Sequence, residues 1–112
     1  MSLAIMTDKS MIVARDKDGR LPIIIGQRSD GYCFSFESFA YQKLGYKTCH
    51  ELKAGEITEI TKDGYNILSE GTDKKKICTF LWTYYGYPTA CYEGVNVELM
   101  RTRNGEIMAE ND

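Results

Sequence analysis

Short apolar or β-branched runs alternate with turn residues along the first third of the chain. The runs at residues 3–6, 11–14, 23–25 and 32–35 are separated by polar or glycine-containing segments. This alternation is typical of antiparallel strands joined by short turns. The run at 23–25 is three consecutive isoleucines after Pro22, which indicates a strand that is covered on both faces. We predict that these four strands form one meander.

The period of the apolar positions changes after this region. Ser35 and Gly45 are suitable residues for the start and end of a helix. Between them, apolar residues recur at helical spacing: Phe36, Phe39, Ala40 and Leu44. Further along, the runs 56–61 and 65–68 flank an Asp-Gly step, which favours a hairpin. The pattern therefore predicts one short helix and a second pair of strands.

The last third of the chain contains an aromatic segment and a helical segment. Residues 77–85 predict a strand that is interrupted at Gly86 and Pro88. From about Val95 the spacing becomes helical, although Gly105 costs about 1 kcal/mol relative to alanine. An isolated helix of this length is barely stable in water, so we expect it to lie against a neighbouring domain. The whole pattern predicts an α+β fold with antiparallel sheets, one short helix and a C-terminal helix.

Composition narrows the class of protein. With 112 residues and a net charge of −2, the chain is one domain or a piece of one, and no nucleic-acid partner is expected. Its only basic run, Lys74 to Lys76, is typical of a solvated loop. No apolar stretch approaches the ~20 residues that span a bilayer, and no leader pattern is visible. We therefore expect a cytoplasmic protein that does not bind membranes.

The cysteines and the single histidine do not form a recognisable metal site. The four cysteines are far apart and contain no Cys-x-x-Cys pair: Cys33, Cys49, Cys78 and Cys91. Free thiols in a reducing compartment are the preferred interpretation. His50 and the neighbouring Cys49 together supply only two ligands, whereas a zinc site needs about four. Asp16 and Asp18 resemble the start of a calcium loop, but Arg20 occupies the third ligand position, so we predict a turn. We expect no metal and no cofactor.

Three ordered motifs carry a family resemblance. They are the segment from Arg15 to Gly26, the segment from Phe36 to Gly45, and Ala54-Gly55-Glu56. Their order and spacing resemble the glutaminase domain of glutamine phosphoribosylpyrophosphate amidotransferases. That family reads Arg-Asp-Pro-x-Gly-x-Arg-Pro-Leu-x-x-Gly, then Ser-Glu-Ser-x-Ala, then Pro-Gly-Glu. The resemblance marks a set of structural motif residues: Arg15, Asp16, Gly19, Pro22, Gly26, Glu37, Ser38, Gly55 and Glu56.

The resemblance continues to the C-terminal helix. Residues 79–88 correspond to a family segment before the glutaminase domain ends, and four residues match the helix that leads into the phosphoribosyltransferase domain: Val97, Arg101, Gly105 and Ala109. The resemblance therefore implies that residues 1–94 are the second half of a class II glutamine amidotransferase domain with a partial N-terminal-nucleophile hydrolase fold. Residues 95–112 would begin the helix toward an absent transferase domain.

The resemblance also implies a function. In the family, an N-terminal cysteine hydrolyses glutamine, and the ammonia attacks phosphoribosylpyrophosphate in the first step of purine synthesis. The nucleophile and most glutamine-binding residues come from the first half of the domain. We therefore expect the chain alone to be inactive, with no catalytic or glutamine-binding residue. Its expected partners are the missing N-terminal half and the transferase domain. Glu37 is expected to tie the short helix to the loop of Arg15.

Departures from the family pattern leave an alternative open. Leu81 and Tyr87 stand where the family has glutamate and arginine, and Thr89-Ala90 replaces Asp-Ser. These changes favour a non-catalytic regulatory or interaction domain with a glutaminase-like fold. A small β-rich binding protein is a third alternative, but it leaves the ordered motifs unexplained. We expect the chain to self-associate as a homo-oligomer, because half a domain leaves apolar surface uncovered.

Overall fold

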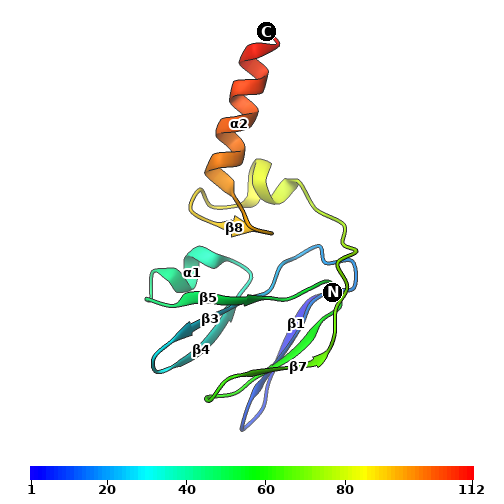
Figure 1. The fold of residues 1–112 in the computed structure, drawn as a ribbon, viewed down its shortest axis with the longest axis vertical. Coiled ribbons are helices and arrows are strands. Elements are labelled where there is room, and N and C mark those ends of the chain that lie inside the picture. Colours follow the sequence, from blue (N-terminus) through cyan, green and yellow to red (C-terminus); the bar gives the residue numbers. More distant parts are fainter.

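The computed structural model describes residues 1–112 as two antiparallel sheets that carry a C-terminal lobe of helical segments (Figure 1). The first sheet has the order β1-β2-β6-β7, with β1 at Leu3–Met6, β2 at Met11–Ala14, β6 at Ile57–Ile60 and β7 at Tyr65–Ser69. The second sheet has the order β4-β3-β5, with β3 at Ile24–Arg28, β4 at Gly31–Ser35 and β5 at Lys47–Glu51.

The remaining elements cover one end of the second sheet. Helix α1 (Ser38–Gln42) connects β4 to β5, and the C-terminal lobe comprises residues 78–112. The lobe contains the helical turn η1 (Leu81–Tyr85), the hairpin of β8 (Cys91–Tyr92) and β9 (Val95–Asn96), and the long helix α2 (Val97–Glu110). The α+β class with antiparallel sheets, a short helix and a C-terminal helix is confirmed. The boundary expected after residue 94 falls inside the β8–β9 hairpin.

The predicted four-stranded meander is wrong. Strands β1 and β2 pair with each other and then with β6, whereas β3 and β4 belong to the other sheet. The connection after Ala14 crosses from one sheet to the other, so Val13 and Ile25 enter the same core from opposite sides. Alternation along a strand shows which side chains are buried, but it does not show which strands are hydrogen-bonded.

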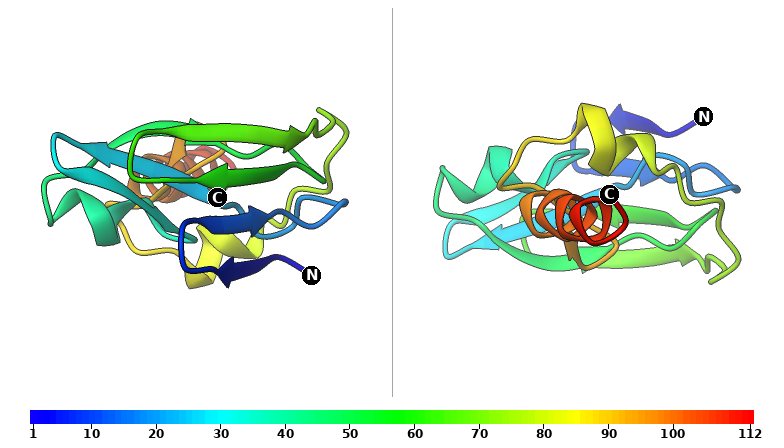
Figure 2. Two further views of the ribbon diagram at one scale, coloured as in Figure 1. Left: turned by 90° about the horizontal axis from the view of Figure 1, so that it is seen from below. Right: turned by 90° about the horizontal axis from the view of Figure 1, so that it is seen from above.

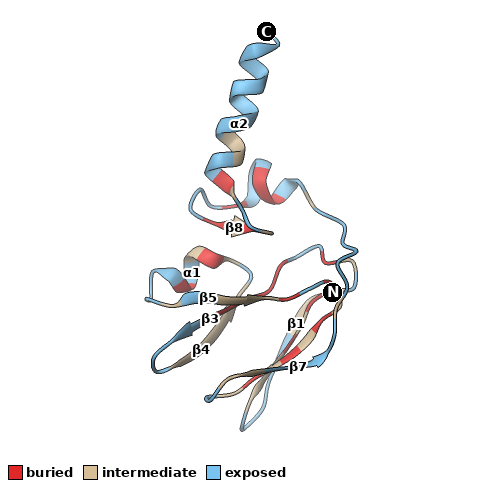
Figure 3. Cartoon of the chain, in the orientation of Figure 1, coloured by how far each residue is buried: buried red, intermediate tan, exposed pale blue.

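The core between the sheets contains Val13, Ile23, Ile25, Leu52 and Ile60 (Figure 3). Ile24, which lies between two core residues, is also buried, so the strand is covered on both faces as predicted. On its other face Tyr41 of α1 packs against Gly26, where an added Cβ would lie 2.9 Å from the Tyr41 ring. Strand β5 had no predicted counterpart, because its polar residues at an edge give no apolar run.

The predicted strand at residues 77–85 is also wrong, because residues 81–85 form a helical turn and the residues before them form no strand. Leu81 and Trp82 are both buried although they are neighbours, an arrangement that one face of a strand does not allow. With Cys78 they form the i, i+3, i+4 face of a helix that packs on Tyr92 and Val97. The aromatic side chains favoured a strand by propensity, whereas burial of this face decides the conformation.

Gly86 allows η1 to end against the rest of the lobe. Its N–H donates to Leu81 O at 2.6 Å, and a Cβ added at Gly86 would lie 2.4 Å from that oxygen and 2.8 Å from Tyr92. We expect Gly86→Ala to lower the free energy of unfolding by about 1–3 kcal/mol, as overpacking does. Gly105→Ala is the control, because that site has free space and lies in α2.

The control should stabilise the protein by about 0.4–1 kcal/mol. Denaturant titration of both variants, followed by circular dichroism, measures the two effects. Equal effects of the two substitutions would contradict the close packing at Gly86.

The molecule is extended. Its Cα radius of gyration is 15.5 Å. A compact chain of this length has a radius of gyration of about 13 Å. The accessible surface is 7372 Å². A compact monomer of this mass exposes about 6300 Å².

Helix α2 contributes to this shape. It projects from the lobe along the long axis of the molecule, so that Figure 2 shows it nearly end-on. Val97 is its only buried residue (Figure 3). No helix has the length and apolar character required to cross a membrane.

Candidate functional site

Five of the nine motif residues lie where the first sheet, the second sheet and the C-terminal lobe come together, whereas Pro22 is buried, Gly26 packs under Tyr41 of α1, Ser38 bonds to Cys91 and Gly55 packs on the Asp16 turn. We call this region the Arg15 junction: Arg15, Asp16, Gly19, Glu37, Glu51, Lys53, Glu56, Lys75, Tyr92 and Glu93. Arg15 follows β2 directly, and its side chain is only 1% exposed. The guanidinium donates to Leu52 O at 2.5 Å and to Gly19 O at 2.6 Å, and it forms an ion pair with Glu93. One arginine therefore connects three separate segments of the chain.

Glu93 is the partner from the C-terminal lobe. It lies in the β8–β9 turn with a φ of 52°. This left-handed conformation costs a non-glycine residue about 1–2 kcal/mol. The Glu93 carboxylate also pairs with Lys75, and the Glu93 N–H donates to Glu51 Oε1 at 3.2 Å. These contacts hold Glu93 in the strained turn, so the turn depends on the junction.

The two glutamates of the junction differ in their pKa. Burial raises the pKa of Glu93, but the bonds from Arg15 and Lys75 outweigh burial and leave it below its usual value. Burial also raises the pKa of Glu51, and the negative charge of Glu93 raises it further. The strong ion pairs therefore belong to Glu93, whereas Glu51 is a partly desolvated neighbour.

The loop after Arg15 is a turn that packs against the turn at Gly55. Asp16 O accepts the N–H groups of Gly19 at 2.8 Å and Gly55 at 2.9 Å, and Asp16 Oδ1 accepts from Asp18 N–H at 2.7 Å. Gly19 has a φ of 69°, and a Cβ there would lie 2.9 Å from the Ala54 Cβ. The structure thus has a turn at the position where the sequence also resembled a calcium loop.

Glu56 is a second buried charge of the junction. Its carboxylate accepts from Lys53 N–H at 2.9 Å and from the Thr58 hydroxyl at 2.6 Å, and it contacts His50 Nε2 at 2.6 Å. Burial raises the pKa of Glu56, but the hydrogen bonds from Thr58, Lys53 and His50 outweigh it and lower the net pKa. Glu56 therefore joins the start of β6 to the end of β5.

The predicted contact of Glu37 with the Arg15 loop is not direct. The Glu37 carboxylate accepts from the Tyr92 hydroxyl at 2.6 Å, while Arg15 pairs with the next residue, Glu93. Burial and the bond to Glu37 raise the pKa of Tyr92 above its usual range. Ser38 Oγ accepts from Cys91 N–H at 2.9 Å. The β8–β9 hairpin mediates between the two motifs, and no element was predicted there because the hairpin is very short.

The junction is built to hold segments together. Arg15 Nε is the only buried side-chain nitrogen or oxygen atom without a hydrogen-bond partner. The four cysteines are free, and burial raises the pKa of Cys33, Cys49 and Cys91 above the usual value. A thiol with a raised pKa is a weak nucleophile at neutral pH. No cluster of histidine, cysteine or carboxylate side chains has the arrangement of a metal site.

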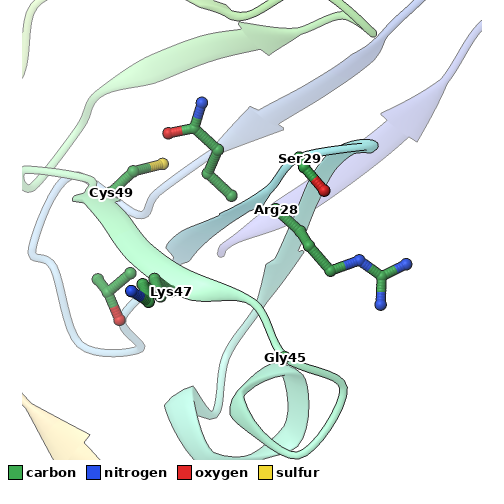
Figure 4. A pocket seen from close by; sticks show the side chains of 7 residues that line it. Arg28, Ser29, Gly45, Lys47 and Cys49 are labelled. Atoms are coloured by element: carbon green, nitrogen blue, oxygen red, sulfur yellow. The ribbon is translucent and has the colours of Figure 1, made fainter.

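A polar hollow of about 420 Å³ lies beside β3 and β5 (Figure 4). It is lined by Gln27, Arg28, Ser29, Gly45, Lys47, Thr48 and Cys49. Arg28 is already engaged, because its guanidinium pairs with Asp30, donates to Leu44 O at 2.7 Å and lies 4.6 Å from the Tyr46 ring centroid. Lys47 is therefore the lining cation without an ion-pair partner, and none of the motif residues lines the hollow.

Comparison with known proteins gives one consistent group of relatives. No family model matches the chain. Amidophosphoribosyltransferase of Bacillus subtilis is 30% identical over 107 residues, covering 95% of this chain and 22% of the relative. The enzyme of Pasteurella multocida is 27% identical over 114 residues, covering 96% and 23%. The rat enzyme is 29% identical over 127 residues, covering 96% and 25%.

Solved structures agree with these relatives. Glutamine phosphoribosylpyrophosphate amidotransferase from B. subtilis, complexed with ADP and GMP, superposes with a TM-score of 0.89 at 28% identity and covers 99% of this chain and 25% of that one. The allosteric regulatory enzyme of purine biosynthesis has a TM-score of 0.88 at 29% identity, covering 97% and 24%. The chain is therefore similar, along nearly its whole length, to a segment of amidophosphoribosyltransferases that makes up about a quarter of those enzymes.

Proposed function

We propose that residues 1–112 act as the second half of a class II glutamine amidotransferase domain of the phosphoribosylpyrophosphate type. In this role they supply framework for the glutaminase site and contribute no nucleophile to it. The observation that supports this proposal most strongly is the superposition on B. subtilis amidotransferase, which covers 99% of the chain with a TM-score of 0.89. The parent protein would belong to purine biosynthesis, and its other half and transferase domain would be the partners.

The positions of the nucleophilic side chains support a framework role. In this type of hydrolase the α-amino group of the chain is the base for the adjacent side chain, so the nucleophile must be the first residue after processing. None of the four cysteines is near the N-terminus. The Met1 amino group is paired with Asp16, and the Ser2 hydroxyl accepts from Asp16 N–H at 3.2 Å.

We expect the purified chain to release no glutamate from glutamine above the buffer blank, because it lacks an N-terminal cysteine. A coupled glutamate assay measures this, with B. subtilis amidophosphoribosyltransferase as the positive control. The Ser2→Ala variant is the matched test of the remaining N-terminal hydroxyl. Glutamate release that Ser2→Ala abolishes would show that the chain carries its own nucleophile.

One observation favours a non-catalytic interaction domain as the second candidate. Two positions that depart from the family pattern are used for apolar packing here. Leu81 is buried in the core of the lobe, and Tyr87 stacks on Phe39 with ring centroids 4.6 Å apart. The coding sequence upstream of residue 1 separates the two candidates. A cysteine codon directly after an initiator methionine, followed by a first half-domain, supports the enzyme, and its absence supports the interaction domain.

A further inference from the structure

The C-terminal lobe has a hydrophobic core of its own. None of its buried residues belongs to the core between the sheets. Of the partly buried residues that pack around the lobe core, only Phe39 of α1 comes from outside the lobe. An apolar hollow of about 320 Å³ lies between the loop at Leu21 and the start of η1. Each hydrophobic core therefore lies on one side of the boundary between the lobe and residues 1–69, which we call the sheet body.

Polar contacts of the β8–β9 hairpin hold the lobe on the sheet body. The Cys91 N–H donates to Ser38 Oγ at 2.9 Å, and the Tyr92 hydroxyl donates to the Glu37 carboxylate at 2.6 Å. Both bonds reach the start of α1, which lies beside β8 (Figure 1). The chain itself connects β7 to the lobe through residues 70–77, of which residues 73–77 form no helix or strand. The lobe is therefore joined to the sheet body by hydrogen bonds, by the ion pairs of the Arg15 junction and by one irregular connection.

Glu93 stands at a position where the hairpin turn does not favour glutamate. Tyr92 pairs with Val95, so Glu93 and Gly94 are the two turn residues, and their φ angles are 52° and 78°. A two-residue turn with positive φ at both positions favours asparagine, aspartate or glycine. Glu93 is also the only residue of the lobe whose side chain forms an ion pair with the rest of the chain. This combination indicates that the contact, rather than the turn, determines which residue is found here.

We propose that residues 78–112 form a hinged unit that docks on the sheet body through Glu93 and is released, still folded, when the ion pair with Arg15 opens. Residues 73–77 are the hinge. Release breaks the polar contacts of the hairpin and the contact of Phe39, but it divides neither hydrophobic core. Water solvates the separated Arg15 and Glu93, which offsets part of the lost attraction. Units that open separately in proteins often coincide with separately packed motifs. The inference does not depend on the proposed function.

Hydrogen exchange of three backbone amides, followed by NMR, separates release from unfolding. The Cys91 N–H bonds across the boundary. The Val97 N–H donates to Ala90 O at 3.0 Å within the lobe, and the Leu52 N–H donates to Ile23 O at 2.9 Å within the sheet body. A bonded amide exchanges when its own bond opens, so each of the three reports on one part of the molecule. In the wild type, the Cys91 amide should be less protected than the amides of Val97 and Leu52.

Glu93→Gln removes the charge that holds the lobe and keeps the size of the side chain. It should lower the protection of the Cys91 amide at least about tenfold, because charge-assisted bonds are lost. The other two amides should keep their protection. Glu98→Gln is the matched control, since Glu98 lies in the first turn of α2, is exposed and has no ion-pair partner. This control should change none of the three amides.

Glu93→Asn tests whether a damaged hairpin causes the effect. Asparagine lacks the carboxylate but suits the turn, so the Cys91 amide should lose protection while the Val97 amide, which depends on the hairpin, keeps it. The proposal is overturned if the Cys91 amide keeps its protection in both variants, or if all three amides lose protection together. It is also overturned if Val97 loses protection with Cys91 in Glu93→Asn, or if Glu98→Gln has the same effect as Glu93→Gln.

Discussion

Arg15→Met is expected to lower the free energy of unfolding by about 3–5 kcal/mol, the range measured when one partner of a buried ion pair is removed. Methionine keeps the apolar stem but removes the charge, which leaves Leu52 O and Gly19 O without their donor and Glu93 with Lys75 alone. Total stabilities of domains are only about 5–15 kcal/mol, so this loss is a large fraction of the stability of the fold. Urea titration with tryptophan fluorescence measures the loss.

Arg28→Met is the matched control for Arg15→Met. Arg28 also pairs with a carboxylate, that of Asp30, but the two side chains are 40% and 59% exposed, so the loss should stay below about 1 kcal/mol. A double-mutant cycle then identifies which residue is the ion-pair partner of Arg15. Arg15 and Glu93 should show a coupling energy of about 0.5–3 kcal/mol, whereas Arg15 and Glu37, which share no contact, should be nearly additive. The reverse result would contradict the junction as described.

Glu56→Gln is expected to destabilise the protein by about 1.5–3 kcal/mol at neutral pH, because a buried carboxylate with several donors is replaced by a neutral amide. The effect should depend on pH. The folded-state pKa of Glu56 is below its usual value of 4.5, so its ionised form stabilises the fold above that value. This contribution is lost as the pH falls through the lower, folded-state pKa. The difference between wild type and Glu56→Gln should therefore shrink in acid.

Urea titrations at about pH 7, 5, 4 and 3 measure this difference. The pKa values of Asp16 and Glu93 are also lowered, so the wild type alone loses stability in acid for several reasons. Comparing the stability of the wild type with that of Glu56→Gln at each pH isolates the contribution of the Glu56 carboxylate. Glu59→Gln, in strand β6 three residues after Glu56 and with no ion-pair partner, should show little difference at any pH. If Glu56→Gln lowers the free energy of unfolding by the same amount from neutral to acid pH, Glu56 is not an ionised, hydrogen-bonded carboxylate.

The pattern of neighbouring residues was sufficient to predict those helices and strands in which buried side chains recur at a regular spacing. The strands at residues 3–6 and 11–14 and the hairpin around Asp63-Gly64 appear where predicted. The C-terminal helix begins at Val97, close to the expected start. These elements depend on alternation, turn residues and helical spacing, which are properties of neighbouring residues. The predictions that were wrong concerned 77–85 and the meander, where packing against distant segments decides the outcome.

The sequence by itself determined the class of fold, the buried strand at Ile23 to Ile25 and the motif residues that form turns, because each depends on residues close together in the chain. Only the tertiary structure decided that Arg15 pairs with Glu93 and that Tyr92 binds Glu37. These partners are separated by 78 and 55 positions, and no local pattern encodes them. A buried charge takes whichever partner the folded chain brings to it, so pairing follows from topology.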